Sequence, residues 1–337
     1  IPLERYLPHH WREDVREVGE VSSEFISKVS EGRVDYAMKV AVNKALLEGK
    51  YDLMLSIGQI VPHEVIGMAN YTKNILIGVG GGDSIHKSHY LGAAFGMERI
   101  MGRVNTPVRA ALNEGFHKYL GHLPMCFLLT VMEKQGEDLF MRGFYAGDDD
   151  QTFEKACKLS QQVNFDLLPK PIKKAVVYLD PREFKTTWLG NKAIYRLRMA
   201  MADEGELIIL APELKGFGED PAIDQLIRKY GYRGTPYILK AVSENKELQD
   251  NLSAAAHLIH GSSEGRFKVT YCPGKDLSLE EIKAVGFEVL KYDEASKIYN
   301  PELLKDGWNQ VQGEEIFYVS NPALGLWALQ EQFPASS

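Results

Sequence analysis

The stretch IVPHEVIGMANYTKNILIGVGGGDSIHKSHYLGA, residues 60–93, carries the signals that decide the fold. Its apolar run predicts a strand over 74–80, which a glycine-rich turn joins to a helix that begins near residue 84. A strand that leads through glycines into a helix is typical of layered α/β proteins. Because such folds bind ligands at strand ends and helix N-termini, we expect the chemistry of this chain close to the turn.

The rest of the chain repeats this alternation. Short apolar runs predict further strands at 52–58, 125–131, 175–179, 207–211 and 267–271. Helical periodicity predicts helices at 35–49, 84–100, 106–120, 151–164, 191–203, 220–230 and 279–285. The pattern therefore predicts an α/β fold with mostly parallel sheets.

The length predicts two domains, because 337 residues exceed what one ordinary hydrophobic core holds. The prolines of Leu168-Pro169-Lys170-Pro171 favour a joint between two α/β lobes. We therefore predict a cofactor-binding lobe over 1–168 and a second lobe over 169–337, with the active site between them. The first residue is Ile1 rather than Met, so we expect the first lobe to lack part of its N-terminus.

The composition excludes several classes of protein. Hydrophobic residues make up 45% and charged residues 25% of the chain, as in an ordinary folded protein. The net charge of -7 disfavours a nucleic-acid partner, because phosphate recognition requires a basic face. No apolar run approaches a membrane span and no signal-peptide core is visible, so no membrane partner is expected. Three scattered cysteines favour a reducing compartment, and we expect the cytoplasm.

Four side chains within 60–93 are candidates for chemistry, namely His63, Lys73, His86 and His89. The two later histidines are three residues apart on one predicted helix, and imidazole binds nickel, copper, zinc or iron. The glycines of the turn let backbone N–H groups approach an anion such as a phosphate. Singly, each residue also has a structural explanation: a hydrogen-bonded histidine, a lysine that extends into water, or a turn that does not fit G-x-G-x-x-G.

The order and spacing of Pro62-His63, Gly67, Lys73, Gly78 and His89 resemble the nickel-pincer lactate racemase family of 2-hydroxyacid racemases and epimerases. The resemblance continues at FYAGD (144–148), at Lys192 and at GELIILA (205–211), and so extends over most of the chain.

The resemblance implies an isomerase that inverts C2 of a 2-hydroxy acid by hydride transfer. Lys73 would carry the cofactor covalently, which is the nickel complex of pyridinium-3,5-bisthiocarboxylic acid mononucleotide. His89 would bind the nickel, His63 would act as acid/base, and Lys192 would hold the substrate carboxylate. The remaining cofactor contacts are expected from Asn70, Thr72, Gly80 and Gly81. Cofactor-biosynthesis proteins would be partners, and recombinant protein made without them is expected to lack the cofactor.

The chain also departs from the family pattern. The loop before the lysine reads GMANYTK (67–73) instead of GFSGGRK, and Leu189 stands where the lactate enzymes have glutamine. A second catalytic histidine and a substrate-binding arginine are expected upstream of residue 1.

A polar sugar acid, such as an aldonate epimerised at C2, is the expected substrate. We expect a sugar acid because short polar side chains are frequent in TTWLGNK (186–192) and HGSSEGRF (260–267) and could bind its hydroxyl groups. The second segment also fits an ordinary turn.

Two other functions remain open from the residues. An NAD-dependent 2-hydroxyacid dehydrogenase would use the GVGGG turn for its dinucleotide. A non-catalytic metal-binding protein would use His86, His89 and His117.

Overall fold

The computed structural model describes residues 5–135, 138–323 and 325–333, and it has the α/β fold that the sequence predicts. The chain divides into two compact units, Ile1–Asn164 and Phe165–Ser337. The joint that we predicted after residue 168 falls at the end of β8 (Asp166–Leu168). This strand pairs in parallel with β15 (Trp327–Leu329), and so it belongs to the second unit.

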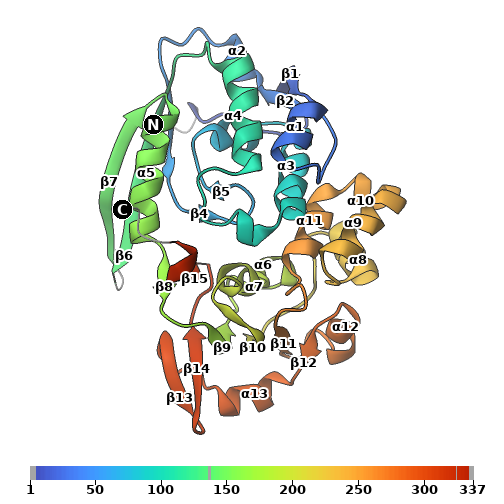
Figure 1. The fold of residues 1–337 in the computed structure, drawn as a ribbon. Coiled ribbons are helices and arrows are strands. Elements are labelled where there is room, and N and C mark those ends of the chain that lie inside the picture. The colour runs from blue at the N-terminus through green and yellow to red at the C-terminus, as the bar shows by residue number, and fades with distance from the viewer. Residues whose placement is uncertain (1–4, 136–137, 324, 334–337) are drawn as a thin grey trace. The chain divides into compact units, whose positions relative to one another are not determined.

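The first unit contains small, mixed sheets with helices packed on them (Figure 1). The antiparallel pairs are β1 with β2, β4 with β5, and β6 with β7, whereas β3 and β6 are parallel. These strands are β1 (Val15–Val21), β2 (Met38–Asn43), β3 (Met54–Gln59), β4 (Pro62–His63), β5 (Gly67–Met68), β6 (Met125–Gln135) and β7 (Asp138–Gly147). The helices are α1 (Ser23–Val29), α2 (Lys44–Glu48), α3 (Gly82–Phe95), α4 (Pro107–Leu120), α5 (Asp150–Val163), the π-helix η2 (Asn74–Gly78) and the 3₁₀-helix η3 (Met97–Arg99).

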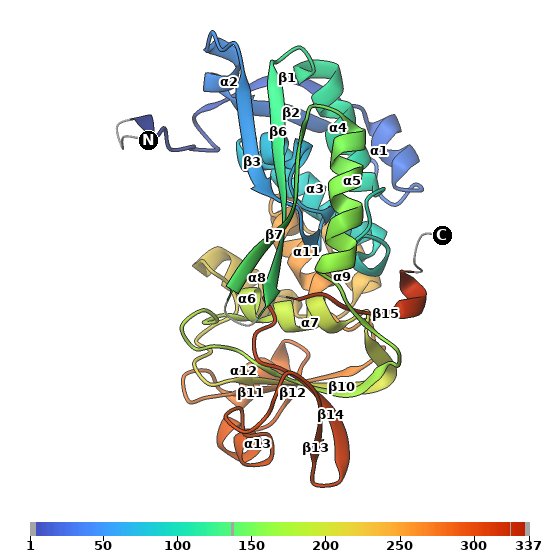
Figure 2. The same ribbon diagram turned by 90° about the vertical axis from the view of Figure 1, so that its left-hand side faces the viewer.

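The helix α5 packs on one face of the β3-β6-β7 sheet, and Figure 2 shows it beside β6 and β7. The hydrophobic face of α5 contributes Phe153, Ala156 and Cys157 to the core, as its 3.6-residue periodicity predicts.

The second unit is built on a six-stranded sheet in the order β12-β11-β10-β9-β14-β13, parallel except for the β13–β14 hairpin. Its strands are β9 (Ile172–Tyr178), β10 (Met201–Ala211), β11 (Lys268–Pro273), β12 (Glu288–Val289), β13 (Gly307–Val311) and β14 (Glu314–Val319). Its helices are α6 (Thr187–Gly190), α7 (Lys192–Leu197), α8 (Pro221–Tyr230), α9 (Thr235–Glu244), α10 (Lys246–Gln249), α11 (Leu252–His260), α12 (Leu279–Ala284) and α13 (Tyr292–Ile298), followed by the 3₁₀-helix η4 (Gln330–Gln332).

Helices cover this sheet on both sides, as a mostly parallel sheet requires. In both views α6 and α7 lie on one side of the sheet and α13 on the other (Figures 1 and 2). On the α13 side, Ala295 and Tyr299 pack with Ile208, Leu210 and Cys272 of the strands in one buried cluster.

Three sequence predictions of local structure are wrong. The run 74–80 forms a π-helical turn instead of a strand, because a short apolar run is equally compatible with a buried helix. The helix predicted over 35–49 is the strand β2 followed by α2, and the helix predicted over 191–203 ends at Leu197 before β10 begins. Among the described residues, every helix is too short or too polar to serve as a membrane span.

Candidate active site

The segment that we call the lysine loop, residues 67–73, leads from β5 to Lys73 with an unusual backbone. At Gly67, φ is +94°, and a Cβ would stand 2.0 Å from the carbonyl oxygen of Arg103. Asn70 and Tyr71 have φ of 73° and 60°, a left-handed region that costs residues other than glycine free energy. The GFSGGRK pattern has glycine at both of these positions, and glycine is the residue that adopts this region without steric cost.

Side chains compensate for the missing glycines. The Oδ1 atom of Asn70 accepts hydrogen bonds from the Tyr71 N–H at 2.7 Å and from the Asn74 amide at 2.6 Å. The ring of Tyr71 is buried and stacks on Phe153 at a centroid distance of 5.1 Å. Local hydrogen bonding is the usual reason that asparagine tolerates the left-handed region.

Arg109 of α4 holds the lysine loop from inside the unit. Its buried guanidinium donates to Thr72 Oγ1 at 2.8 Å, to the Met68 carbonyl at 2.7 Å and to the Asn70 carbonyl at 3.2 Å. It also lies 4.3 Å from the Phe153 ring centroid. Burial lowers the pKa of Arg109 to about 10, so the side chain is still a cation at neutral pH.

These contacts bear on two predicted cofactor ligands. Thr72 is fully buried, and its hydroxyl donates to Asn113 Oδ1 at 2.7 Å while it accepts from Arg109. Asn70 is 3% exposed and its oxygen is used within the loop. Both residues therefore shape the loop, and the cofactor contacts expected of them stay predictions.

Lys73 is half-buried at the start of the π-helical turn. Burial lowers the pKa of its amine, the Glu64 carboxylate raises it, and the Arg109 cation lowers it. A lowered pKa increases the share of neutral amine, which is the nucleophilic form. Lys73 is thus suited to covalent attachment of an electrophilic group.

His89 lies in α3 and uses one ring nitrogen for a hydrogen bond to the backbone of its own helix. Its Nδ1 donates to the Ile85 carbonyl at 2.6 Å, which leaves the lone pair of Nε2 available. Burial lowers the pKa of His89, with the Lys73 charge acting in the same direction and Glu64 against it. The ring is therefore neutral at pH 7, as metal binding requires, and it shares an electrostatic neighbourhood with Lys73 and Glu64.

His86, the other histidine of α3, makes a T-shaped contact with Trp11, and their ring centroids are 6.0 Å apart. His117 of α4 pairs with Asp150 at 3.4 Å. Within the described ranges no three His, Cys, Asp or Glu side chains gather into a metal-binding group. The metal-binding alternative built on His86, His89 and His117 therefore has no structural support.

His63 lies in β4, beside Glu64 at the turn of the β4–β5 hairpin. Its Nδ1 accepts a hydrogen bond from the Val65 N–H at 3.1 Å. A neutral ring in this position carries its proton on Nε2.

The glycine turn pairs with β2. The Gly81 N–H donates to the Ala41 carbonyl at 3.1 Å, and the Gly80 carbonyl receives the His9 side chain at 3.0 Å. The Gly81 donor is therefore already used, and the phosphate contacts predicted for Gly80 and Gly81 stay predictions. Since no strand precedes this turn, the strand-turn-helix context that the dehydrogenase alternative needs is missing here.

In the second unit, Lys192 is the half-buried first residue of α7. The polar residues expected to bind a sugar acid are mostly occupied. Glu264 accepts from the Thr235 N–H and hydroxyl, Arg266 donates to Asp203, and Ser262 Oγ accepts from the Glu264 N–H. These contacts hold the turn that follows α11, and the sugar-acid contacts expected of 186–192 and 260–267 stay predictions.

The sequence pattern did not predict a buried hydrogen-bond network around His257. Thr187 Oγ1 donates to the Phe217 carbonyl at 3.2 Å, so it accepts from the Tyr232 hydroxyl at 2.9 Å. Tyr232 must then accept from His257 Nε2 at 2.8 Å, and His257 Nδ1 accepts from the Tyr195 hydroxyl at 2.6 Å. Burial lowers the pKa of His257 to about 3, which keeps the ring neutral. The available signal was a histidine inside the apolar run LSAAAHLIH.

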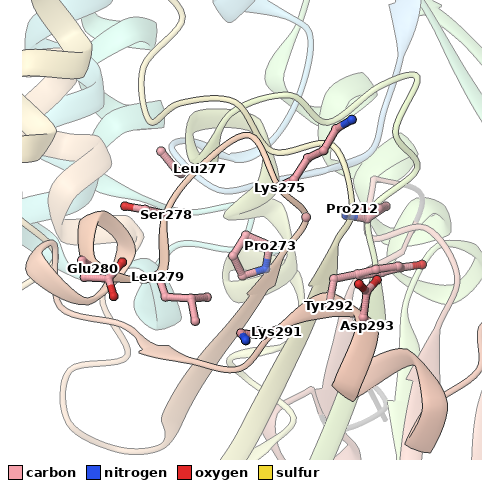
Figure 3. A pocket seen from close by; sticks show the side chains of 11 residues that line it. Pro212, Pro273, Lys275, Leu277, Ser278, Leu279, Glu280, Lys291, Tyr292 and Asp293 are labelled. Atoms are coloured by element: carbon pink, nitrogen blue, oxygen red, sulfur yellow. The ribbon is translucent and has the colours of Figure 1, made fainter.

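Figure 3 shows a pocket of about 660 Å³ beyond the carboxyl ends of β10 and β11. Pro212 and Pro273 form part of its wall, and Lys275, Lys291 and Asp293 supply charges of both signs. None of the predicted site residues lines it.

The match to a known protein family lies in the first unit. Residues 14–99, which include His63, Lys73 and His89, match the family model of the lactate racemase N-terminal domain. No curated protein matches the sequence significantly.

Two solved structures resemble the chain. A Thermotoga maritima protein from a structural genomics consortium is 24% identical, with a TM-score of 0.77 over 95% of this chain and 77% of that one. The lactate racemase apoprotein of Thermoanaerobacterium thermosaccharolyticum is 16% identical, with a TM-score of 0.68 over 95% of this chain and 70% of that one. At these identities the similarity establishes a shared fold.

Proposed function

We propose that the protein is a racemase or epimerase that inverts C2 of a 2-hydroxy acid. The observation that carries the proposal is the pairing of Lys73 with His89 in one electrostatic neighbourhood, on a segment similar to the lactate racemase N-terminal domain. A half-buried amine of lowered pKa and a neutral imidazole with an available Nε2 fit a covalently attached nickel-pincer nucleotide. When bound, this group supplies a hydride acceptor and donor.

The chain's own residues bind, orient and move protons. Lys73 would carry the nucleotide and His89 would bind its nickel through Nε2. Lys192 holds the substrate carboxylate by a charge-assisted hydrogen bond. His63 exchanges a proton with the 2-hydroxyl oxygen. Because its Nδ1 accepts from the Val65 N–H, the neutral ring carries its proton on Nε2. Nε2 can act as a base only in the tautomer that has moved this proton to Nδ1 and given up the Val65 hydrogen bond.

The test is co-expression of the full chain with cofactor-biosynthesis proteins, the partners that we propose for loading. Intact mass and nickel content report loading, and exchange of configuration at C2 in D- and L-2-hydroxy acids reports activity. Lys73→Ala should lose the added mass, whereas Lys118→Ala, on the exposed side of α4, should retain it. Equal loading of the two variants would refute the attachment site.

Three further substitutions test the separate roles of the histidines. His89→Ala should lose nickel, whereas His86→Ala should retain it. His63→Ala should keep the cofactor and lose about 10²- to 10⁴-fold in turnover, the usual contribution of an acid/base. Turnover close to that of the wild type would remove His63 from the mechanism.

A further inference from the structure

Three side chains form one face of the α6–α7 segment, and we call them the Trp188 face: Trp188, Leu189 and Lys192. Asn191 joins the two short helices with helical backbone angles, and its N–H donates to the Thr187 carbonyl at 2.8 Å. Residues three and four apart on such a turn are neighbours. All three side chains are half-buried, whereas Thr187, Gly190 and Asn191 are buried.

The aromatic part of this face is rigid. The Trp188 ring stacks on His257 at a centroid distance of 4.2 Å and an interplanar angle of 27°. Hydrogen bonds from Tyr195 and to Tyr232 hold both nitrogens of that imidazole. A ring fixed in this way loses little conformational entropy when a ligand covers it.

The polar atoms of the face are available. Across the part of the chain that the structure describes, neither the Lys192 ammonium nor the Trp188 indole N–H has a hydrogen bond or an ion pair. By contrast, Lys185 of the preceding segment is paired with Glu213 at 3.1 Å. A half-buried lysine without a counter-ion is suited to an anionic ligand group.

The neighbouring polar side chains already have hydrogen-bond partners within the unit. Thr186 donates to Glu219, Thr187 donates to the Phe217 carbonyl, and Asn191 Oδ1 accepts from the Tyr271 hydroxyl at 2.7 Å. Around Lys192 the face therefore offers indole and leucine carbons. Apart from the Lys192 ammonium and the Trp188 indole N–H, the face offers no polar partner, so most hydroxyl groups of a sugar acid would lose water there without gaining a hydrogen bond, which is costly.

We propose that the Trp188 face selects 2-hydroxy acids with an apolar or aromatic side chain, whose carboxylate pairs with Lys192 and whose side chain lies on Trp188 and Leu189. The inference rests on the proposed function for the identity of the ligand as a 2-hydroxy acid. The proposed substrate is therefore an apolar acid, whereas the sequence led us to expect a polar sugar acid.

The first test is calorimetric titration of the full chain without cofactor, using phenyllactate, lactate and gluconate. Phenyllactate should bind about 10- to 100-fold more tightly than gluconate, since apolar contacts discriminate by roughly this factor. Lys192→Met should abolish phenyllactate binding, and Trp188→Ala and Leu189→Gln should each weaken it. Lys185→Met and Trp308→Ala, which alter a paired lysine and a tryptophan of β13, should leave it unchanged.

Tighter binding of gluconate, no binding of phenyllactate, or phenyllactate binding that survives both Trp188→Ala and Leu189→Gln would overturn the inference. The cofactor-loaded enzyme then separates the two proposals. Inversion of aldonates without inversion of apolar acids would refute the proposed substrate class, but it would support the proposed racemase activity. If enzyme with cofactor on Lys73 inverts none of these acids, the proposed racemase activity is refuted. The titrations then still show which acids the Trp188 face binds.

Discussion

Acid should destabilise the second unit through His257. Because burial lowers the folded pKa to about 3 from the ordinary 6.5, the folded unit binds fewer protons than the unfolded chain between these values. The stability that the neutral ring allows is complete above pH 6.5 and is lost progressively as the pH falls toward 3. Between pH 7 and pH 5 the loss is about 2 kcal/mol, at about 1.36 kcal/mol for each pH unit below 6.5.

Urea unfolding at pH 7 and pH 5 measures this loss, followed by the fluorescence of Trp188, Trp308 and Trp327, which all lie in the second unit. His257→Asn removes the titrating group, and the carboxylates contribute equally to both proteins. The wild-type midpoint should fall by about 1 M urea more than that of the variant, for a slope near 2 kcal/mol/M. Equal shifts in the two proteins would refute the assignment of a neutral, buried His257.

Three further perturbations test the first unit. Arg109→Met should lower the local stability of the lysine loop by about 2–4 kcal/mol, because hydrogen bonds from a charged donor are lost, and hydrogen exchange of the loop amides should accelerate accordingly. Gly67→Ala should lower the first unit's melting temperature, since its Cβ would stand 2.0 Å from a carbonyl oxygen; Gly78→Ala, which meets nothing within 4 Å, is the matched control. Burial lowers the pKa of His89 from 6.5, so its ring should take up a proton only below that pH in an NMR titration. A ring half-protonated above pH 6.5 would contradict this.

The sequence predicted the α/β class and most of the helices and central strands from periodicity. It failed at 74–80, where an apolar run without polar alternation does not distinguish a strand from a buried helix. The spacing of Lys73 and His89 was enough to nominate them, and the structure adds the Glu64 and Arg109 charges that act on the lysine. The contribution of Arg109 could not be predicted, because folding brings this side chain of α4 to a loop that lies far from it in sequence.

The substrate prediction remains untested, but its motivation from the sequence has a related weakness. Counting hydroxyl and amide groups in 186–192 and 260–267 shows that polar atoms are present, but it does not show which way they point. In the folded unit, hydrogen bonds to residues 29 to 80 positions away, such as Phe217 and Tyr271, occupy most of them.

The left-handed backbone at Asn70 and Tyr71 has an evolutionary consequence. A relative with glycine at position 71 would relax the backbone but lose the aromatic stack with Phe153, which also supports the Arg109 guanidinium. Selection at these positions is therefore coupled, and we expect the identities at 71, 109 and 153 to change together among descendants of this loop. In a homologue that has glycine at position 71 without changes at 109 and 153, we expect the loop that carries the lysine to be more mobile.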